Sequence, residues 1–230
     1  MITEYQTQSE LNPALWTGDE LKPKLRLSLL KIAKYFYEFL GIETPVNDVT
    51  LTGSNANYNW TTKSDIDLHI LVNYKLINDN ELLVRNHMMA KKNIWNTKYP
   101  LKYKGMNIEL YAQDTNEPHA SSGVYSLCKN KWLMTPNPEM ISVEDDAIDK
   151  KAKPYEYEID NLNSEDVDVL DKIKDIKDRL RNLRQTGLGS VGEYSIENLA
   201  FKALRNSGHL GKLNNLEKAS TFSHLTPKEV

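Results

Sequence analysis

The sequence predicts an α+β protein: a small mixed β-sheet domain with packed helices, followed by a helical C-terminal region. Two observations support this fold class. In the first half of the chain, short β-type runs alternate with segments of helical periodicity. The second half carries charged segments whose apolar residues fall on one helical face. The chain has 230 residues, 40% of them hydrophobic, which suits one large domain or two small ones.

The first helix is expected over residues 23–40. Pro23 suits its first turn, and Gly41 suits its end. Apolar residues recur inside this segment at spacings of three and four, which predicts a stripe that packs on a sheet. The stripe consists of Leu25, Leu29, Ile32, Phe36 and Phe39.

The elements that follow complete the sheet domain. Their order of strand, loop, strand, helix, strand, strand is typical of a sheet covered by helices. The expected ranges are a strand at 48–52, a loop at 53–63, a strand at 65–72, a helix at 79–98, and strands at 100–104 and 106–112.

The composition of the chain predicts four parts. Residues 1–20 are polar and predict an N-terminal arm, which Leu15 and Trp16 could pin to a domain surface. The catalytic domain is expected over residues 21–140. Residues 141–164 are acidic and polar and predict a linker, and residues 165–230 predict a helical domain.

The helical domain is expected to contain a charged helix at 165–184, a glycine-rich break at 186–195 and a second helical segment at 195–217. The first helix carries basic residues interleaved with aspartates, which favours a solvated face with i,i+4 ion pairs over a surface that follows phosphates. The segment 187–192, GLGSVG, has the composition of a phosphate loop. It lacks the Lys-Ser/Thr ending and a preceding strand, so we reject that interpretation.

The charge balance and the single cysteine limit the location and the partners. A formal net charge of -3 does not favour long duplex DNA as a ligand. Cys128 cannot form an internal disulfide, which fits a reducing compartment. The N-terminus has neither the basic nor the apolar region of a signal peptide, and no stretch is apolar enough to span a membrane. We therefore expect a cytoplasmic protein without a membrane partner.

Two carboxylates lie in an otherwise apolar strand. Asp65 and Asp67 alternate with Ile66 and Leu68, so they face the same way with Cα atoms roughly 7 Å apart. Unpaired, they would repel each other, and a divalent cation removes this conflict. Oxygen ligands suit Mg²⁺ or Mn²⁺. Glu109, on a later strand, is the best candidate for a third ligand.

A Gly-Ser pair precedes these carboxylates. Gly53 allows a close approach of the backbone, and Ser54 offers a hydroxyl and an N–H donor. A turn at this point that opens a helix would hold a phosphate. The stretch 53–67 therefore predicts a phosphate site followed by a metal site.

This arrangement resembles the signature of the polymerase β-like nucleotidyltransferase superfamily. The motif is Gly-Ser, nine residues, then Ser-Asp-Ile-Asp-Leu, and it places Gly53, Ser54, Asp65 and Asp67, with Glu109 as the third carboxylate. The resemblance covers about residues 25–115. The wider sequence also resembles predicted nucleotidyltransferases of bacteriophages, for which the location would be the host cytoplasm.

The resemblance implies an enzyme that binds two Mg²⁺ ions, or Mn²⁺, through Asp65, Asp67 and Glu109. It implies transfer of a nucleotidyl group from an NTP such as ATP to a hydroxyl or phosphate acceptor, with release of pyrophosphate. The acceptor could be an RNA, a small molecule or a protein. The expected nucleotide-binding residues are Gly53, Ser54, Asn55, Lys63 and Ser64.

One departure from the motif lies in the loop that is expected to bind the nucleotide. Many members of the superfamily carry a glycine four residues after the motif serine, where this chain has Tyr58.

The alternative function is a non-catalytic nucleotide-binding or assembly module that retains the fold. The presence of all three acids favours the enzyme.

Overall fold

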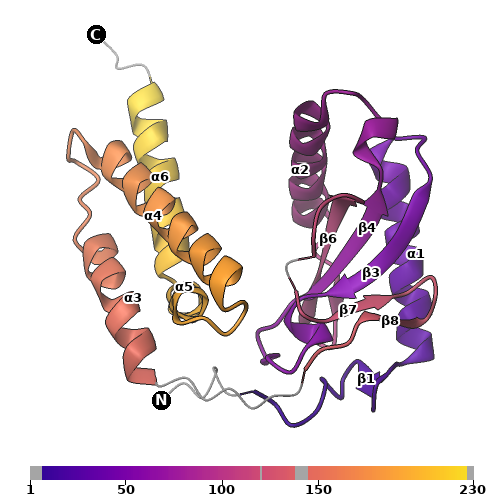
Figure 1. Ribbon diagram of the computed structural model, residues 1–230. Helices are drawn as coiled ribbons and strands as arrows, with labels where there is room; N and C mark the ends of the chain where they lie inside the picture. The colour runs from indigo at the N-terminus through magenta and orange to yellow at the C-terminus, as the bar shows by residue number, and fades with distance from the viewer. Residues whose placement is uncertain (1–6, 120, 138–144, 227–230) are drawn as a thin grey trace. The chain divides into compact units, whose positions relative to one another are not determined.

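The computed structural model describes residues 7–119, 121–137 and 145–226 (Figure 1). The chain divides into two compact units, Met1–Met140 and Ile141–Val230. The first unit contains the sheet and the second is helical, so the predicted fold class, an α+β protein with a helical C-terminal region, is confirmed. None of the described helices combines the length and apolar character that a membrane span requires.

The main sheet of the first unit has six strands in the order β5-β6-β4-β3-β7-β8. The β4 and β6 strands run parallel, and the other neighbouring strands run antiparallel, so the sheet is mixed. The strands are β3 (Val46–Thr52), β4 (Ile66–Val72), β5 (Lys102–Tyr103), β6 (Met106–Asp114), β7 (Val124–Ser126) and β8 (Lys131–Met134).

Two helices, α1 (Pro23–Leu40) and α2 (Glu81–Lys98), cover one face of this sheet (Figure 1). The α1 helix has its proline in the first turn and ends at Gly41, which adopts the left-handed conformation with φ of 69°. The α2 helix begins after Asn80, whose side chain accepts a hydrogen bond from the Leu83 N–H at 3.1 Å. Their apolar sides share one core with the sheet.

The alternation of side chains gives the sheet two different faces. Along β4, the residues from Ile66 to Val72 alternate strictly between buried and half-buried. The buried set lies in the core under α1 and α2. The half-buried set, which includes Asp67 and His69, therefore lies on the opposite face, which α1 and α2 do not cover.

The predicted N-terminal arm is instead part of the core in the described residues from Thr7 onward. Leu15 and Trp16 are buried, and Trp16 stacks on Trp132 with ring centroids 4.8 Å apart. Trp16 Nε1 also donates to the Asn55 carbonyl at 2.7 Å. The short hairpin of β1 (Trp16–Thr17) and β2 (Glu20–Leu21) holds this segment in place. The sequence predicted an arm because residues 7–20 contain few apolar side chains among many polar ones.

The strands after residue 115 were not predicted from the sequence. The β7 and β8 strands have three and four residues, which is too short for alternation to be recognised. Their neighbours in the sheet and the Trp16–Trp132 contact stabilise them.

The second unit contains α3 (Asp145–Asp160), α4 (Val169–Ser190), α5 (Ile196–Asn206) and α6 (His209–Leu225) (Figure 1). The predicted linker over residues 141–164 is wrong where α3 lies. Ile148, Ala152 and Ile159 of this helix are buried at spacings of four and seven. The acidic and polar residues around them form its exposed side and concealed this pattern.

The predicted glycine-rich break at 186–195 is also shorter than expected, because α4 continues through Gly187 and Gly189 to Ser190. Gly187 has a packing role here: a Cβ at this position would lie 2.4 Å from Ser195 Oγ. Ser195 caps α5 by accepting a hydrogen bond from the Asn198 N–H at 3.2 Å. The missing side chain therefore lets the start of α5 pack closely against α4.

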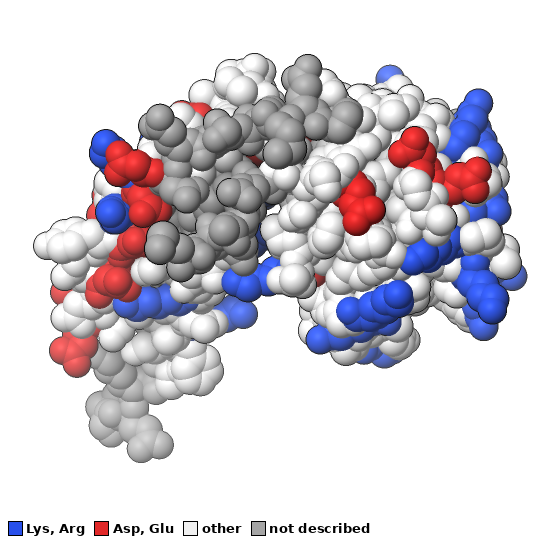
Figure 2. Space-filling model, turned by 90° about the horizontal axis from the view of Figure 1, so that it is seen from below, with Lys and Arg blue, Asp and Glu red and all other residues white. Residues whose placement is uncertain are grey.

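Charged side chains of both signs occur in small groups on the face drawn in Figure 2. This distribution agrees with the composition, which has 32 acidic and 29 basic residues. Positive charge on this face therefore occurs in small local groups and does not form one continuous basic surface.

We predict that Trp16→Ala lowers the free energy of unfolding of the first unit by about 3–5 kcal/mol, because it removes a buried ring and its hydrogen bond. Urea unfolding followed by tryptophan fluorescence measures this, since all four tryptophans, Trp16, Trp60, Trp95 and Trp132, lie in the first unit. Leu27→Ala, at a side chain that is 63% exposed on α1, is the control and should change the value by less than about 0.5 kcal/mol. Equal effects of the two substitutions would contradict the core role of Trp16.

Candidate functional site

Two of the predicted carboxylates occupy adjacent positions on the open face of the sheet. Asp67 of β4 lies opposite Glu109 of β6 in the parallel register. Both residues are half-buried. The next pair along the same face is His69 and Tyr111, whose rings lie 5.1 Å apart. The sheet therefore brings Asp67 and Glu109 together, although 41 residues separate them in the sequence.

Asp65 lies directly before β4, where two asparagines hold it. Its Oδ1 accepts a hydrogen bond from Asn107 Nδ2 at 3.0 Å, and its backbone carbonyl accepts one from Asn55 Nδ2 at 2.8 Å. Asn107 lies on β6, two residues before Glu109. Both the carboxylate and the backbone of Asp65 are thus fixed by neighbouring segments.

The turn at Gly53 lies against the carboxylate of Asp67. Gly53 has φ of 74° and ψ of -164°, a region that is almost confined to glycine. A Cβ at this position would lie 2.0 Å from Asp67 Oδ2. The glycine is therefore needed for two reasons, its backbone conformation and its close approach to Asp67.

The predicted turn at Gly53 is followed by a short 3-10 helix, Ser54–Ala56. The Ser54 hydroxyl donates to Ser64 Oγ at 2.8 Å, and Ser64 Oγ also accepts from the Thr61 N–H at 2.9 Å. These bonds close the loop between the two halves of the motif. Ser54 and Ser64 thus meet in space next to Asp65.

The other two residues predicted to bind nucleotide differ in their surroundings. Asn55 is fully buried, and its Oδ1 accepts from Asn12 Nδ2 at 2.7 Å. Because its amide also donates to the carbonyl of Asp65, Asn55 positions the loop and the backbone at Asp65. The predicted nucleotide contact of Asn55 stays a prediction. Lys63 is exposed at the loop, and its backbone N–H donates to Thr61 Oγ1 at 3.1 Å.

The oxygen ligands at this end of the sheet fit a hard divalent cation in kind. Asp67 and Glu109 are neighbours, and the Gly53 turn leaves the Asp67 carboxylate the room that a side chain would take. In the described part of the chain, however, no group of three His, Cys, Asp or Glu side chains is close enough to hold a metal ion. Carboxylates repel one another, and Asp65 is engaged by Asn107 instead.

A polar network extends the site along β6. His69 Nδ1 lies 2.8 Å from Gln113 Oε1, and Gln113 Nε2 donates to the Glu117 carbonyl at 2.9 Å. Burial is the main cause that lowers the pKa of His69 to about 4, so this ring is neutral at pH 7. It therefore supports the site through hydrogen bonds and adds no positive charge beside the acids.

Sequence reasoning missed the contributions of Asn107, Tyr111 and Gln113. The signal that could have found them is the alternation of β6, where residues 107, 109, 111 and 113 all fall on the face of Glu109. Their partners are distant in sequence, so only the parallel pairing with β4 shows what they contact.

Comparison with known proteins gives little further information. No protein-family model matches the sequence, and no curated protein matches it. Among solved structures, one similar chain is described as the STING-associated CdnE c-di-GMP synthase from Capnocytophaga granulosa. The two chains are 11% identical with a TM-score of 0.25, over 92% of this chain and 85% of that one. A likeness at this level carries no argument about function, so the assignment depends on the residues described above.

We predict that Gly53→Ala destabilises the first unit by about 1–3 kcal/mol more than Gly105→Ala does. Both glycines have positive φ, 74° and 87°, so both substitutions strain the backbone. Only at Gly53 would the new methyl group meet Asp67, because nothing lies within 4 Å of a Cβ at Gly105. Urea unfolding of both variants measures the difference, and equal losses of stability would show that the approach to Asp67 has no cost.

Proposed function

We propose that the protein is a Mg²⁺- or Mn²⁺-dependent nucleotidyltransferase, which transfers a nucleotidyl group from an NTP to a hydroxyl or phosphate acceptor and releases pyrophosphate. The observation that supports this most is the close approach of the Gly53 turn to Asp67, beside the Asp67–Glu109 pair. This arrangement puts a glycine turn next to two carboxylates, and Gly53, Asp67 and Glu109 follow one another along the chain as in the motif of the resembled superfamily.

In this proposal Asp67, Glu109 and Asp65 would hold the metal ions. When bound, these ions would supply positive charge that neutralises the triphosphate and lowers the pKa of the attacking hydroxyl. Glu109 would also accept the proton of the acceptor hydroxyl, and its position beside Asp67 at the open face supports this proposal. The backbone of Gly53 and the hydroxyl of Ser54 would contact the phosphates, and Lys63 would contribute positive charge from the exposed loop. The protein mainly positions the reactants.

The acceptor is proposed as an RNA, a small molecule or a protein side chain. The net charge of -3 gives no support to long duplex DNA. The transfer is direct, without a covalent enzyme intermediate. The acceptor oxygen forms a bond to the α-phosphorus, and the bond from the α-phosphorus to the leaving pyrophosphate breaks. Where the acceptor is a hydroxyl, Glu109 takes its proton.

A second candidate is a nucleotide-binding or assembly module without catalysis. One observation favours it: the carboxylate of Asp65 is hydrogen-bonded to Asn107, and the three acids do not form a ready group of ligands in the described residues. In a catalytic protein, the Asp65 carboxylate would have to leave this hydrogen bond to act as a metal ligand. In the module, the bond would persist while the nucleotide is bound.

We predict that wild type, with Mg²⁺ or Mn²⁺ and an α-phosphate-labelled NTP, transfers label to an acceptor in cellular RNA or lysate protein. The double variant Asp65→Asn/Asp67→Asn should reduce this transfer at least about 100-fold, because it removes the metal ligands. The exposed Asp79→Asn is the matched control and should retain the activity. Binding of NTP without transfer to any acceptor tested would favour the non-catalytic module.

Metal removal should act through the same residues. We predict that excess EDTA abolishes the transfer and that added Mn²⁺ restores it. Glu109→Gln should weaken Mn²⁺ binding, measured by isothermal titration calorimetry, about tenfold or more. The exposed Glu43→Gln, which removes one charge elsewhere in the same unit, should bind Mn²⁺ like wild type. Equal Mn²⁺ affinities of the two variants would remove Glu109 from the metal site.

A further inference from the structure

The helical unit contains a basic pocket with an apolar floor, which the proposed reaction does not use. Its volume is about 520 Å³, and α4, α5 and α6 line it. This volume lies in the range of small-molecule sites. None of the ten residues that line it is acidic.

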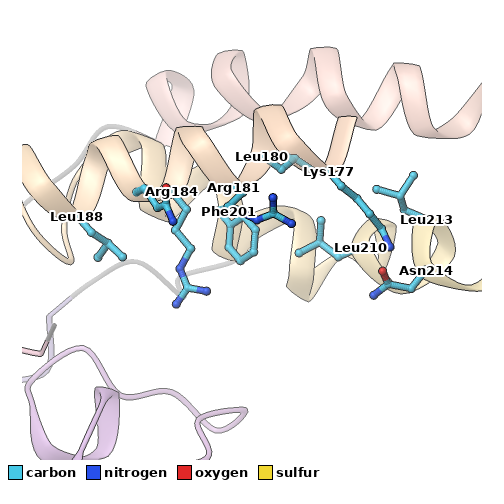
Figure 3. Close-up of a pocket in the computed structure, with 10 residues that line it drawn as sticks. Lys177, Leu180, Arg181, Arg184, Leu188, Phe201, Leu210, Leu213 and Asn214 are labelled. Atoms are coloured by element: carbon cyan, nitrogen blue, oxygen red, sulfur yellow. The ribbon is translucent and has the colours of Figure 1, made fainter. Parts of the chain in front are cut away.

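Three cations project into this pocket from one side of α4. Lys177, Arg181 and Arg184 are spaced by four and three residues, so they lie on the same helical face. Figure 3 shows all three side chains extending from α4 toward α5 and α6. Such a cluster provides the charge and the planar N–H donors that phosphate groups prefer.

An aromatic ring contacts one guanidinium of this cluster, that of Arg184. Arg184 lies over the ring of Phe201, with 4.9 Å between its Cζ and the ring centroid. The apolar floor continues from Phe201 to Leu210, and Asn214 supplies an amide at the edge (Figure 3). A flat heterocycle can therefore pack on the floor while its phosphates reach the cations.

Acidic residues balance two of the cations without entering the pocket. Lys177 donates to Glu217 of α6, and Arg181 donates to Asp178 at 2.7 Å. Neither Glu217 nor Asp178 lines the pocket. The exposed Arg181–Asp178 pair contributes little stability, so an anionic ligand can replace it at small cost. The Lys177–Glu217 pair is partly buried, and its lysine can keep this partner while it contacts the ligand.

We propose that this pocket binds a nucleoside phosphate at a site separate from the Asp67–Glu109 centre. The phosphates would contact Arg181, Arg184 and Lys177, and the base would pack against Phe201 and Leu210. The ligand is a free nucleotide, because the pocket has the volume for one nucleotide unit. This inference does not depend on the proposed transferase activity.

Isothermal titration calorimetry on the full-length chain in EDTA tests the proposal, because EDTA removes the metals that the other site requires. The Asp65→Asn/Asp67→Asn background provides a second way to silence that site. We expect one ATP to bind per chain. Inorganic tripolyphosphate should bind more weakly, and adenosine should bind more weakly still. The proposal would be overturned if neither the wild type nor the Asp65→Asn/Asp67→Asn variant showed saturable ATP binding in EDTA.

Two substitutions separate the phosphate contact from the ring contact. Arg184→Gln should weaken ATP binding about tenfold or more. Phe201→Leu keeps the apolar volume and should weaken binding of ATP more than binding of tripolyphosphate, because it removes the surface for the base but keeps all three cations. Lys174→Gln is the matched control on α4, since it removes a charge outside the pocket, and its affinity should stay within about twofold of wild type. Far-ultraviolet circular dichroism checks that each variant is folded.

Three further results would overturn the proposal. One is an equal ATP affinity of Arg184→Gln and Lys174→Gln, which would exclude the pocket as the phosphate site. Another is adenosine that binds as tightly as ATP. A nucleoside phosphate can also be presented at the end of an RNA strand, so a short oligoadenylate that binds more tightly than ATP would overturn the free nucleotide as the occupant.

Discussion

The parallel pairing of β4 with β6 determines the candidate site. Because side chains alternate on both strands, this register places Ile66, Leu68 and Leu110 under the helices and Asp67 with Glu109 on the other face. A shift of the register by one residue would bury the acids and expose the apolar set. The apolar core therefore stabilises the register, and the register positions the acids.

The site also shows how a protein can hold carboxylates close together without a strong penalty. The acids are half-buried at an open face, where water reduces their repulsion. Their neighbours are amides, hydroxyls and a neutral histidine, all of which form hydrogen bonds and add no like charge. The structural cost falls on the backbone at Gly53, where the residue type allows a conformation that others avoid.

Local sequence patterns predicted the regular elements of the first unit and the candidate acids. The stripe of α1, the alternation of β4 and the signals at Pro23 and Gly41 depend on neighbours within a few residues, so the sequence displays them directly. The buried N-terminal segment, β7 and β8 depend on contacts between distant residues, and a single sequence does not display these. In α3, polar residues outnumber the few buried apolar ones, which made a helix resemble a linker.

The same limit applies within the site. Asp65, Asp67 and Gly53 follow from a motif, because their spacing along the chain carries the information. The roles of Asn107 and of the buried Asn55 follow only from pairing in three dimensions. The amide of Asn55 is a group that could bind a ligand, but this residue is buried and its hydrogen bonds support the loop.

The contact between Trp16 and Trp132 of β8 has a consequence for folding during synthesis on the ribosome. Trp132 Nε1 donates to the carbonyl of Asp19, 113 residues earlier, and its ring stacks on Trp16. The N-terminal segment leaves the ribosome first but must wait for this partner on the order of ten seconds. During that time its apolar side chains have no native cover, so closure of the first unit depends on the completion of its last strand.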